Sequence, residues 1–319
     1  MSYITEQLRV SLNEKLREFL NFPYADTENI SKSCYELAQA VIQYSLYEPQ
    51  MFITRRKTVQ FEFENKKSYL EIEVFDDRYE IYQKDEENSV EKEFHKSIKT
   101  DDLFEIFNII KIFYKGEPQN SVLFTGAFNP IHIGHYHMIE SALDKGFDYV
   151  IFAVSNQQFL DKKAKKSREK IVFNEEQRLQ MLLQSTYLNP NVLIFGVEQG
   201  YTYNVLCSVK DKYKMPYLYF AMGSDKLKEI ERWGFHDRLL SEFSFYVLLR
   251  NDNEEDAKRK CDEIFRNTSY IIGIDNDKFK DISSTKVREL IKYHKSYKRY
   301  VPNGVENLIS GYLCKGYSN

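Results

Sequence analysis

The pattern of apolar and polar positions changes near residue 118 of the chain. Before that point, leucine and isoleucine recur at helical spacing from Ile4 to Leu20, which predicts an amphipathic helix that Pro23 ends. A second helix is expected over 31–46. Apolar and polar residues then alternate over 58–64, 69–75 and 79–82, with Asp76-Asp77 as the turn between the last two segments. Alternation of this kind predicts a half-buried antiparallel sheet.

A further helix is expected over 101–114, followed by a Lys115–Pro118 linker. Residues 1–118 are therefore predicted to form a small α+β domain, and they contain no catalytic constellation. The sequence leaves the role of this domain open.

From residue 121 onward, short apolar runs alternate with helical patterns. One of these helices begins with a capping box formed by Asn174 and Gln177. Such alternation predicts a parallel sheet covered on both faces, with a ligand at the carboxyl ends of its strands. The predicted strands of this 119–319 domain are 122–125, 149–154, 192–195, 217–221, 245–249 and 270–272.

Composition narrows the class of protein. The 319 residues are 42% hydrophobic and 29% charged, typical of a soluble globular protein, and the net charge of −3 gives no reason to expect a nucleic-acid partner. The charged first residues and the lack of a long apolar run indicate no signal peptide, no membrane partner and a cytoplasmic location. The four widely spaced cysteines argue against a zinc site or a disulfide framework. Homo-oligomerisation stays open.

Residues 121–135, SVLFTGAFNPIHIGH, carry the strongest chemical signal. An apolar strand runs into Gly126, which permits a sharp exit, and Pro130 biases Asn129 toward an extended conformation. A helix expected from about Gly134 places His132 and His135 at its N-terminus, where free N–H groups and the helix dipole favour a phosphate. The stretch therefore predicts a nucleotide-handling site.

Residues 132–135 resemble the HxGH signature of a nucleotidyltransferase superfamily, and 282–288, ISSTKVR, resemble its ISSTxxR signature. Further segments are similar to the nicotinate or nicotinamide mononucleotide adenylyltransferases: Gly223 with Asp225 and Trp233, Arg178 with Met181, Gly200-Tyr201-Thr202, and Val301-Pro302 with Val305. The resemblance covers residues 120–315 and implies a Rossmann-like doubly wound parallel sheet. It also implies adenylyl transfer from ATP to nicotinate or nicotinamide mononucleotide, with release of pyrophosphate, in NAD biosynthesis.

The resemblance also implies roles for individual residues. His132, His135 and Arg288 are the expected catalytic residues, and Mg²⁺ is expected to bind mainly through the ATP phosphates, with no protein metal site. The expected ATP-binding residues are Gly126, Ala127, Phe128, Gly134, Gly223, Asp225, Ser283, Ser284 and Thr285. The expected mononucleotide-binding residues are Asn129, Lys162, Lys163, Arg178, Thr202 and Trp233.

Several of these residues have a structural alternative. Asp225 could instead cap the next helix, and Arg178 could form a structural ion pair. Lys162 and Lys163 belong to a basic run that is also typical of a solvated loop. Trp233 could be a core residue rather than a platform for the pyridine ring.

The chain departs from the family pattern at a few positions. Ala127 stands where the family has threonine or serine, Asn204-Val205 replaces Asp-Thr, and Gly234 follows Trp233 where a large residue is usual. These changes leave the choice between nicotinate and nicotinamide open. Two alternative functions stay open: a nucleotidyltransferase with another phosphate acceptor, such as phosphopantetheine, and a non-catalytic nucleotide sensor, which these changes and the extra N-terminal domain favour.

Overall fold

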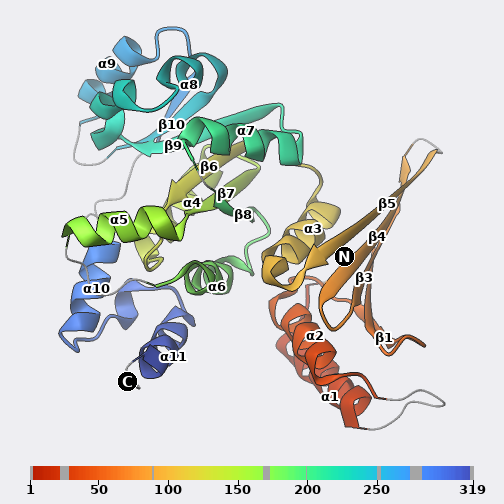
Figure 1. Cartoon of the computed structure of the whole chain (residues 1–319). Helices are drawn as coiled ribbons and strands as arrows, with labels where there is room; N and C mark the ends of the chain where they lie inside the picture. The colour runs from red at the N-terminus through yellow and green to blue at the C-terminus, as the bar shows by residue number, and fades with distance from the viewer. Residues whose placement is uncertain are drawn as a thin grey trace. The chain divides into compact units, whose positions relative to one another are not determined.

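A computed structural model describes residues 3–21, 29–87, 90–167, 173–198, 200–249, 253–273 and 282–316 (Figure 1). The chain forms two compact units, one of Met1–Glu117 with Tyr187–Pro190 and one of Pro118–Thr186 with Asn191–Asn319. No helix in the described ranges combines the length and apolarity needed to cross a membrane.

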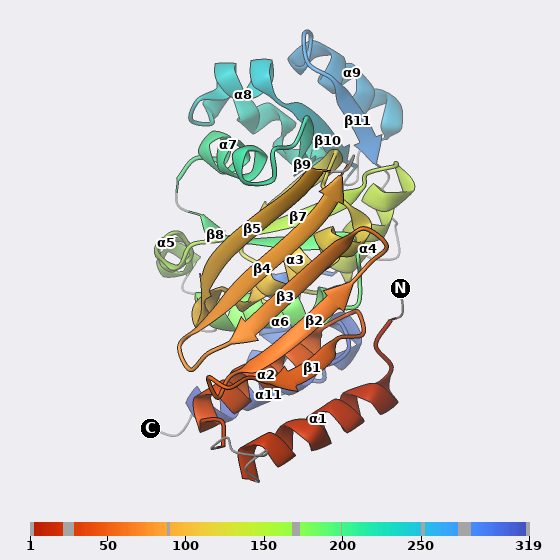
Figure 2. The same cartoon turned by 90° about the vertical axis from the view of Figure 1, so that its right-hand side faces the viewer.

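The first unit is built on an antiparallel meander of five strands, whose order in the sheet follows the order in the chain (Figure 2). The alternation predicted over 58–64 is seen in the second strand, whose residues Val59, Phe61 and Phe63 are buried while those between them are partly exposed. The strands are β1 (Gln50–Ile53), β2 (Val59–Glu64), β3 (Ser68–Val74), β4 (Arg78–Glu87) and β5 (Val90–Lys99).

Three helices accompany this sheet: α1 (Glu6–Asn21), α2 (Lys32–Tyr44) and α3 (Leu103–Lys115), the last preceded by the short helix η1 (Thr100–Asp102). Helix α2 packs against β2 and β3, and α3 packs against β3 and β5. The buried guanidinium of Arg9 in α1 donates to the carbonyls of Ile42, Gln43 and Ser45, at the end of α2. These carbonyls would otherwise lack donors, so Arg9 fastens the two N-terminal helices together.

The three predicted helices and the Asp76-Asp77 turn of this unit are confirmed, while Pro23, the expected end of the first helix, lies outside the described residues. Strands β1 and β5 were not predicted. In β5 the described side chains are mostly exposed, Phe94 among them, and Ile98 is buried. An edge strand of this kind shows too little apolar alternation to stand out in the sequence.

The second unit contains a six-stranded parallel sheet with the order β11-β10-β9-β6-β7-β8. The chain winds outward in one direction from β6 and then in the other from β9, which is the doubly wound, Rossmann-like order. The predicted fold class and its six strands are confirmed. They are β6 (Asn120–Gly126), β7 (Tyr149–Ser155), β8 (Val192–Glu198), β9 (Tyr217–Gly223), β10 (Ser244–Leu248) and β11 (Tyr270–Gly273).

Helices follow each strand of this sheet and carry the segments of chemical interest. They are α4 (Ile133–Asp144), α5 (Gln157–Ser167), α6 (Glu175–Thr186), α7 (Thr202–Tyr213), η2 (Ser224–Arg232), α8 (His236–Glu242), α9 (Glu254–Ile264), α10 (Ser284–Lys292), η4 (Lys298–Tyr300) and α11 (Val305–Gly316). The predicted capping box at α6 is present, because Asn174 and Gln177 exchange hydrogen bonds of 3.0 and 2.8 Å. Helix α11 packs against α6 (Figure 1).

Candidate functional site

A cavity of about 760 Å³ opens at the carboxyl ends of β6, β7 and β9. This is where the strand order reverses, between β6 and β9, and doubly wound sheets bind ligands at that switch point. The lining residues are Phe124–Ala127, Met138, Ala153–Asn156, Gln158, Lys162, Gly200–Thr202, Val205, Phe220–Gly223, Asp225, Lys226 and Trp233.

The loop after β6 turns sharply around an aromatic ring. Phe128 has a left-handed backbone (φ 44°) and is buried, with its ring 5.2 Å from that of Phe152. A Cβ at Gly126 would lie 3.0 Å from the Cζ atom of Phe128. Gly126 is therefore needed for the close approach of this ring.

His132 and His135 lie at the start of α4, as the sequence predicted. His132 is the N-cap residue, and its backbone N–H donates to Nδ1 of His135 at 3.2 Å. The two imidazoles stack with centroids 3.6 Å apart. Because Nδ1 of His135 accepts this bond, the proton of its neutral ring is on Nε2. Nε2 of the neutral His135 ring is thus a hydrogen-bond donor. Gly134 allows the stack, since a Cβ there would lie 3.1 Å from the ring of His132.

Helix α10, which lies near the C-terminal end of the sequence, contacts the same loop through side-chain hydrogen bonds. The Ser284 hydroxyl donates to the carbonyl of Pro130 at 2.8 Å, and Nη1 of Arg288 donates to the carbonyl of Asn129 at 2.6 Å. Arg288 also donates to the hydroxyl of Thr285, while Ser283 caps the helix through the N–H of Lys286. The segment 282–288 therefore contacts residues 129–130, which directly precede the segment 132–135 and adjoin the cavity, although about 150 residues separate the two segments in the sequence.

Arg178 is fully buried and holds three backbone segments together. Its guanidinium donates to the carbonyls of Phe173, Ala127 and Ser155 at 3.1, 2.9 and 2.8 Å. Burial lowers its pKa to about 10, so the side chain is charged at neutral pH. The side chain of Asn129 accepts the N–H of Phe173 at 3.0 Å. Both residues were expected to contact the mononucleotide, and the structure places both side chains in the protein interior.

The far side of the cavity is formed by the segment after β9. Trp233 is half-buried, with its ring 5.8 Å from that of Phe220 in an edge-on arrangement. Asp225 is exposed and lies 3.8 Å from the ammonium of Lys226. Gly223 is the N-cap residue of η2, so Asp225 is not the N-cap of this helix.

The structure divides the remaining predicted residues into two groups. Gly126, Ala127, Gly223, Lys162 and Thr202 line the cavity together with Asp225 and Trp233. The second group lies on the loop after β6 or in the first turns of α4 and α10. Its members are Phe128, Asn129, His132, Gly134, His135, Ser283, Ser284, Thr285 and Arg288. The side chain of Lys163 lies outside the described residues.

Some lining residues were not predicted. Ser155 and Asn156 directly follow the apolar run of β7, so the rule that ligands bind at carboxyl strand ends could have identified them. Lys226 follows Asp225, and Tyr201 lies inside the quoted Gly200–Thr202 turn. No spacing in the sequence indicates that these last two side chains face the cavity.

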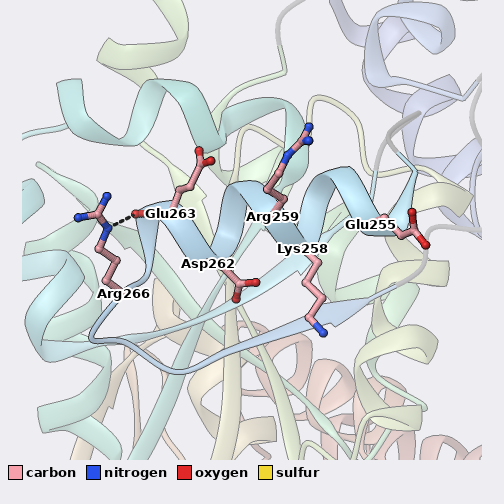
Figure 3. Close-up of a pocket in the computed structure, with 6 residues that line it drawn as sticks. All are labelled: Glu255, Lys258, Arg259, Asp262, Glu263 and Arg266. Atoms are coloured by element: carbon pink, nitrogen blue, oxygen red, sulfur yellow. Dashed lines mark hydrogen bonds between the residues drawn. The ribbon is translucent and has the colours of Figure 1, made fainter.

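A second hollow lies along α9, with charged side chains that point to opposite sides of the helix (Figure 3). Its lining residues are Glu255, Lys258, Arg259, Asp262, Glu263 and Arg266. Arg259 pairs with Asp256 one turn away, and Arg266 donates to the carbonyl of Glu263. These charges have no common centre, so this surface is a solvated helix face.

Comparison with known families decides the class of protein. The family model described as cytidylyltransferase-like matches residues 123–290, which is more than half of the chain. The chain belongs to the cytidylyltransferase-like family. This nucleotidyltransferase contains, within the matched range, the cavity and both signature segments. The family model does not cover residues 1–122.

Several relatives of this nucleotidyltransferase have the same name. A protein of Caldicellulosiruptor saccharolyticus, named a probable nicotinate-nucleotide adenylyltransferase, is 31% identical over 192 residues, covering 59% of this chain and 94% of that protein. A protein of Cytophaga hutchinsonii with the same name is 28% identical over 203 residues, covering 62% and 97%. Among solved structures, the Plasmodium falciparum nicotinic acid mononucleotide adenylyltransferase complexed with NaAD aligns with a TM-score of 0.49 at 17% identity, covering 63% of this chain and 98% of that one.

Proposed function

We propose that this nucleotidyltransferase transfers the adenylyl group of ATP to nicotinate mononucleotide, with nicotinamide mononucleotide as the less favoured acceptor, in NAD biosynthesis. The observation that carries the proposal is that relatives named nicotinate-nucleotide adenylyltransferases align with this chain over almost their whole length. The cavity at the strand-order reversal supports it, since the loop that follows β6 adjoins the cavity and is contacted by Ser284 and Arg288.

In the proposed reaction, a 5′-phosphate oxygen of the mononucleotide attacks the α-phosphorus of ATP. A new P–O bond forms, the bond between the α-phosphorus and the bridging oxygen breaks, and pyrophosphate leaves with its negative charge. Such a transfer needs no protein nucleophile but needs alignment and stabilisation of charge. The first N–H groups of α4 and the Nε2–H of His135 supply donors. Arg288 and the start of α10 supply a cation and further donors on the other side of the loop.

Arg178 and Asn129 have positioning roles in this proposal. Arg178 fixes Ala127 and Ser155 relative to each other. Ala127 directly follows β6 and Ser155 is the last residue of β7, and both residues line the cavity. Asn129 joins the loop to Phe173 through its side chain and to Arg288 through its carbonyl. A rigid loop keeps the phosphate donors aligned, which is how distant residues contribute to rate.

The acceptor base would bind against Trp233, and Thr202 favours nicotinate. Thr202 is the first residue of α7 and lines the same cavity as Trp233. The N-terminus of a helix carries partial positive charge, which favours a carboxylate over a neutral amide. Lys162, which also lines the cavity, would contact the phosphate of the mononucleotide, and Asp225 would accept a hydrogen bond from a ribose hydroxyl of ATP.

Magnesium would bind mainly through the substrate phosphates. Within the described residues, no three histidine, cysteine or acidic side chains come together as a metal site, and Asp225 is the one carboxylate among those that line the cavity. This donor set fits an ion that takes most of its ligands from phosphates and water. When bound, the ion supplies neutralisation of phosphate charge.

The test is release of pyrophosphate by the purified full-length protein with ATP and Mg²⁺. Separate reactions receive nicotinate mononucleotide, nicotinamide mononucleotide, phosphopantetheine or no acceptor. We expect turnover with the two pyridine mononucleotides, and a higher kcat/KM for the nicotinate form. Turnover only with phosphopantetheine would replace this proposal with a different acceptor class. ATP binding without any turnover would indicate a nucleotide sensor.

A further inference from the structure

Gly234 directly follows Trp233, and its backbone conformation does not require a glycine. Its φ angle is outside the left-handed region, so the backbone would accept an ordinary side chain. A Cβ atom at this position would instead lie within 2.9 Å of three ring atoms of Tyr201. Ordinary contacts of carbon atoms are 3.5–4.0 Å. The ring of Tyr201 therefore occupies the space that a side chain at residue 234 would fill.

Tyr201 reaches this position from a different loop. It is the N-cap residue of α7, and its ring also packs edge-on against Phe235, with centroids 5.3 Å apart. Despite these contacts the side chain is 57% exposed, and Tyr201 lines the cavity together with Trp233 and Thr202. One part of the ring is thus held by the 234–235 segment, while the rest is open to solvent at the cavity.

We propose that Tyr201 is a second aromatic contact for the pyridine mononucleotide, positioned by the absence of a side chain at Gly234. The inference rests on the proposed function, since it names a further binding residue for the same acceptor. Tyrosine offers a rigid ring face and a polar tip, which suits the boundary between an aromatic base and its ribose. Loss of one base–aromatic contact weakens binding, and we expect the affinity for the mononucleotide to fall about tenfold.

The two positions allow a selective test. Tyr201→Ala removes the ring. Gly234→Ala keeps the ring but displaces it, because an exposed tyrosine can rotate away from the new methyl group. If the only effect of Gly234→Ala is to move Tyr201, the change has no consequence once Tyr201 is already alanine. The three variants Tyr201→Ala, Gly234→Ala and the double variant therefore form a double-mutant cycle.

Each variant is assayed for kcat and for KM with nicotinate mononucleotide and with ATP. We expect both single variants to raise the mononucleotide KM about tenfold, with the ATP KM unchanged within twofold. The double variant should match Tyr201→Ala alone. Two controls test for general effects: Gly311→Ala, at a helical site with no atom within 4 Å of the new Cβ, and Tyr217→Ala, an exposed tyrosine outside the cavity lining. Both should behave as the wild type.

A binding measurement separates this inference from the proposed reaction. Trp233 is the only tryptophan of the chain, so its fluorescence reports mononucleotide binding directly. Wild-type binding without turnover would contradict the proposed function, and the cycle is then read from dissociation constants. An unchanged mononucleotide affinity in Tyr201→Ala, or effects of the two single variants that add in the double variant, would overturn the role of Tyr201. A wild-type protein that binds no mononucleotide would overturn both.

Discussion

Replacing Arg178 by methionine tests whether this residue serves the fold or the ligand. Methionine keeps an unbranched apolar stem but removes the guanidinium, which leaves the carbonyls of Phe173, Ala127 and Ser155 without that donor. An unsatisfied buried polar group costs ~1–3 kcal/mol. Part of this cost is offset because the charged guanidinium no longer has to be desolvated. We therefore expect Arg178→Met to lower the free energy of unfolding by about 3 kcal/mol.

Urea unfolding followed by Trp233 fluorescence measures this effect in the unit that contains both residues. For a unit of this size, the expected loss corresponds to a decrease in Tm of about 6–12 °C. Arg178→Lys should fall between the two proteins, because one ammonium keeps the charge but cannot point toward three carbonyls at once. Arg259→Met, at an exposed site on α9, is the matched control and should unfold as the wild type does.

Two outcomes would refute this account of Arg178. A stability loss below about 1 kcal/mol would mean that its hydrogen bonds do not hold the loop. A stable Arg178→Met protein with a raised mononucleotide KM would mean that the side chain binds the substrate directly.

Other predictions follow from the same structure. His135→Ala and Arg288→Ala should each lower kcat at least ~100-fold, because each removes a donor to developing charge. His137→Ala, a control on the same helix whose side chain pairs with Glu140 outside the cavity lining, should keep the wild-type rate, and loss of activity there would undo the assignment. Trp233→Ala should raise the mononucleotide KM about tenfold and leave the ATP KM unchanged; an unchanged mononucleotide KM would exclude stacking. Burial lowers the pKa of Lys111 to about 7, below its value in the unfolded chain. The unfolded state therefore binds more protons, and this residue's penalty decreases as pH rises from 7 to 10. Lys111→Met should stabilise the protein most below pH 7 and least near pH 10, and an advantage that does not vary with pH in denaturation curves would contradict this.

Much of the second unit could be predicted from sequence because its strands are buried on both faces. Runs such as Tyr149–Val154 have no polar interruption, and the capping box of Asn174 and Gln177 marks a helix start with its own hydrogen bonds. The edge strand β5 could not be predicted, since an exposed edge needs few apolar residues. Its place in the sheet comes from pairing with β4 rather than from its own pattern.

The candidate site likewise has residues that the sequence predicts and contacts that it does not predict. The segments of His132 and Arg288 are visible in the sequence because each has a fixed internal spacing. The burial of Arg178 and the contact between Tyr201 and Gly234 are not, because they depend on how loops from distant parts of the chain pack together. No periodicity of a single segment reports such a contact.

The most direct test of the central claim is identification of the product. The full-length protein is incubated with ATP, Mg²⁺ and nicotinate mononucleotide, and the dinucleotide and pyrophosphate are measured together by mass spectrometry and an enzyme-coupled assay. The account predicts equal amounts of the two products, and almost none with Arg288→Ala. Consumption of ATP without formation of the dinucleotide, or equal product yield from Arg288→Ala, would contradict it.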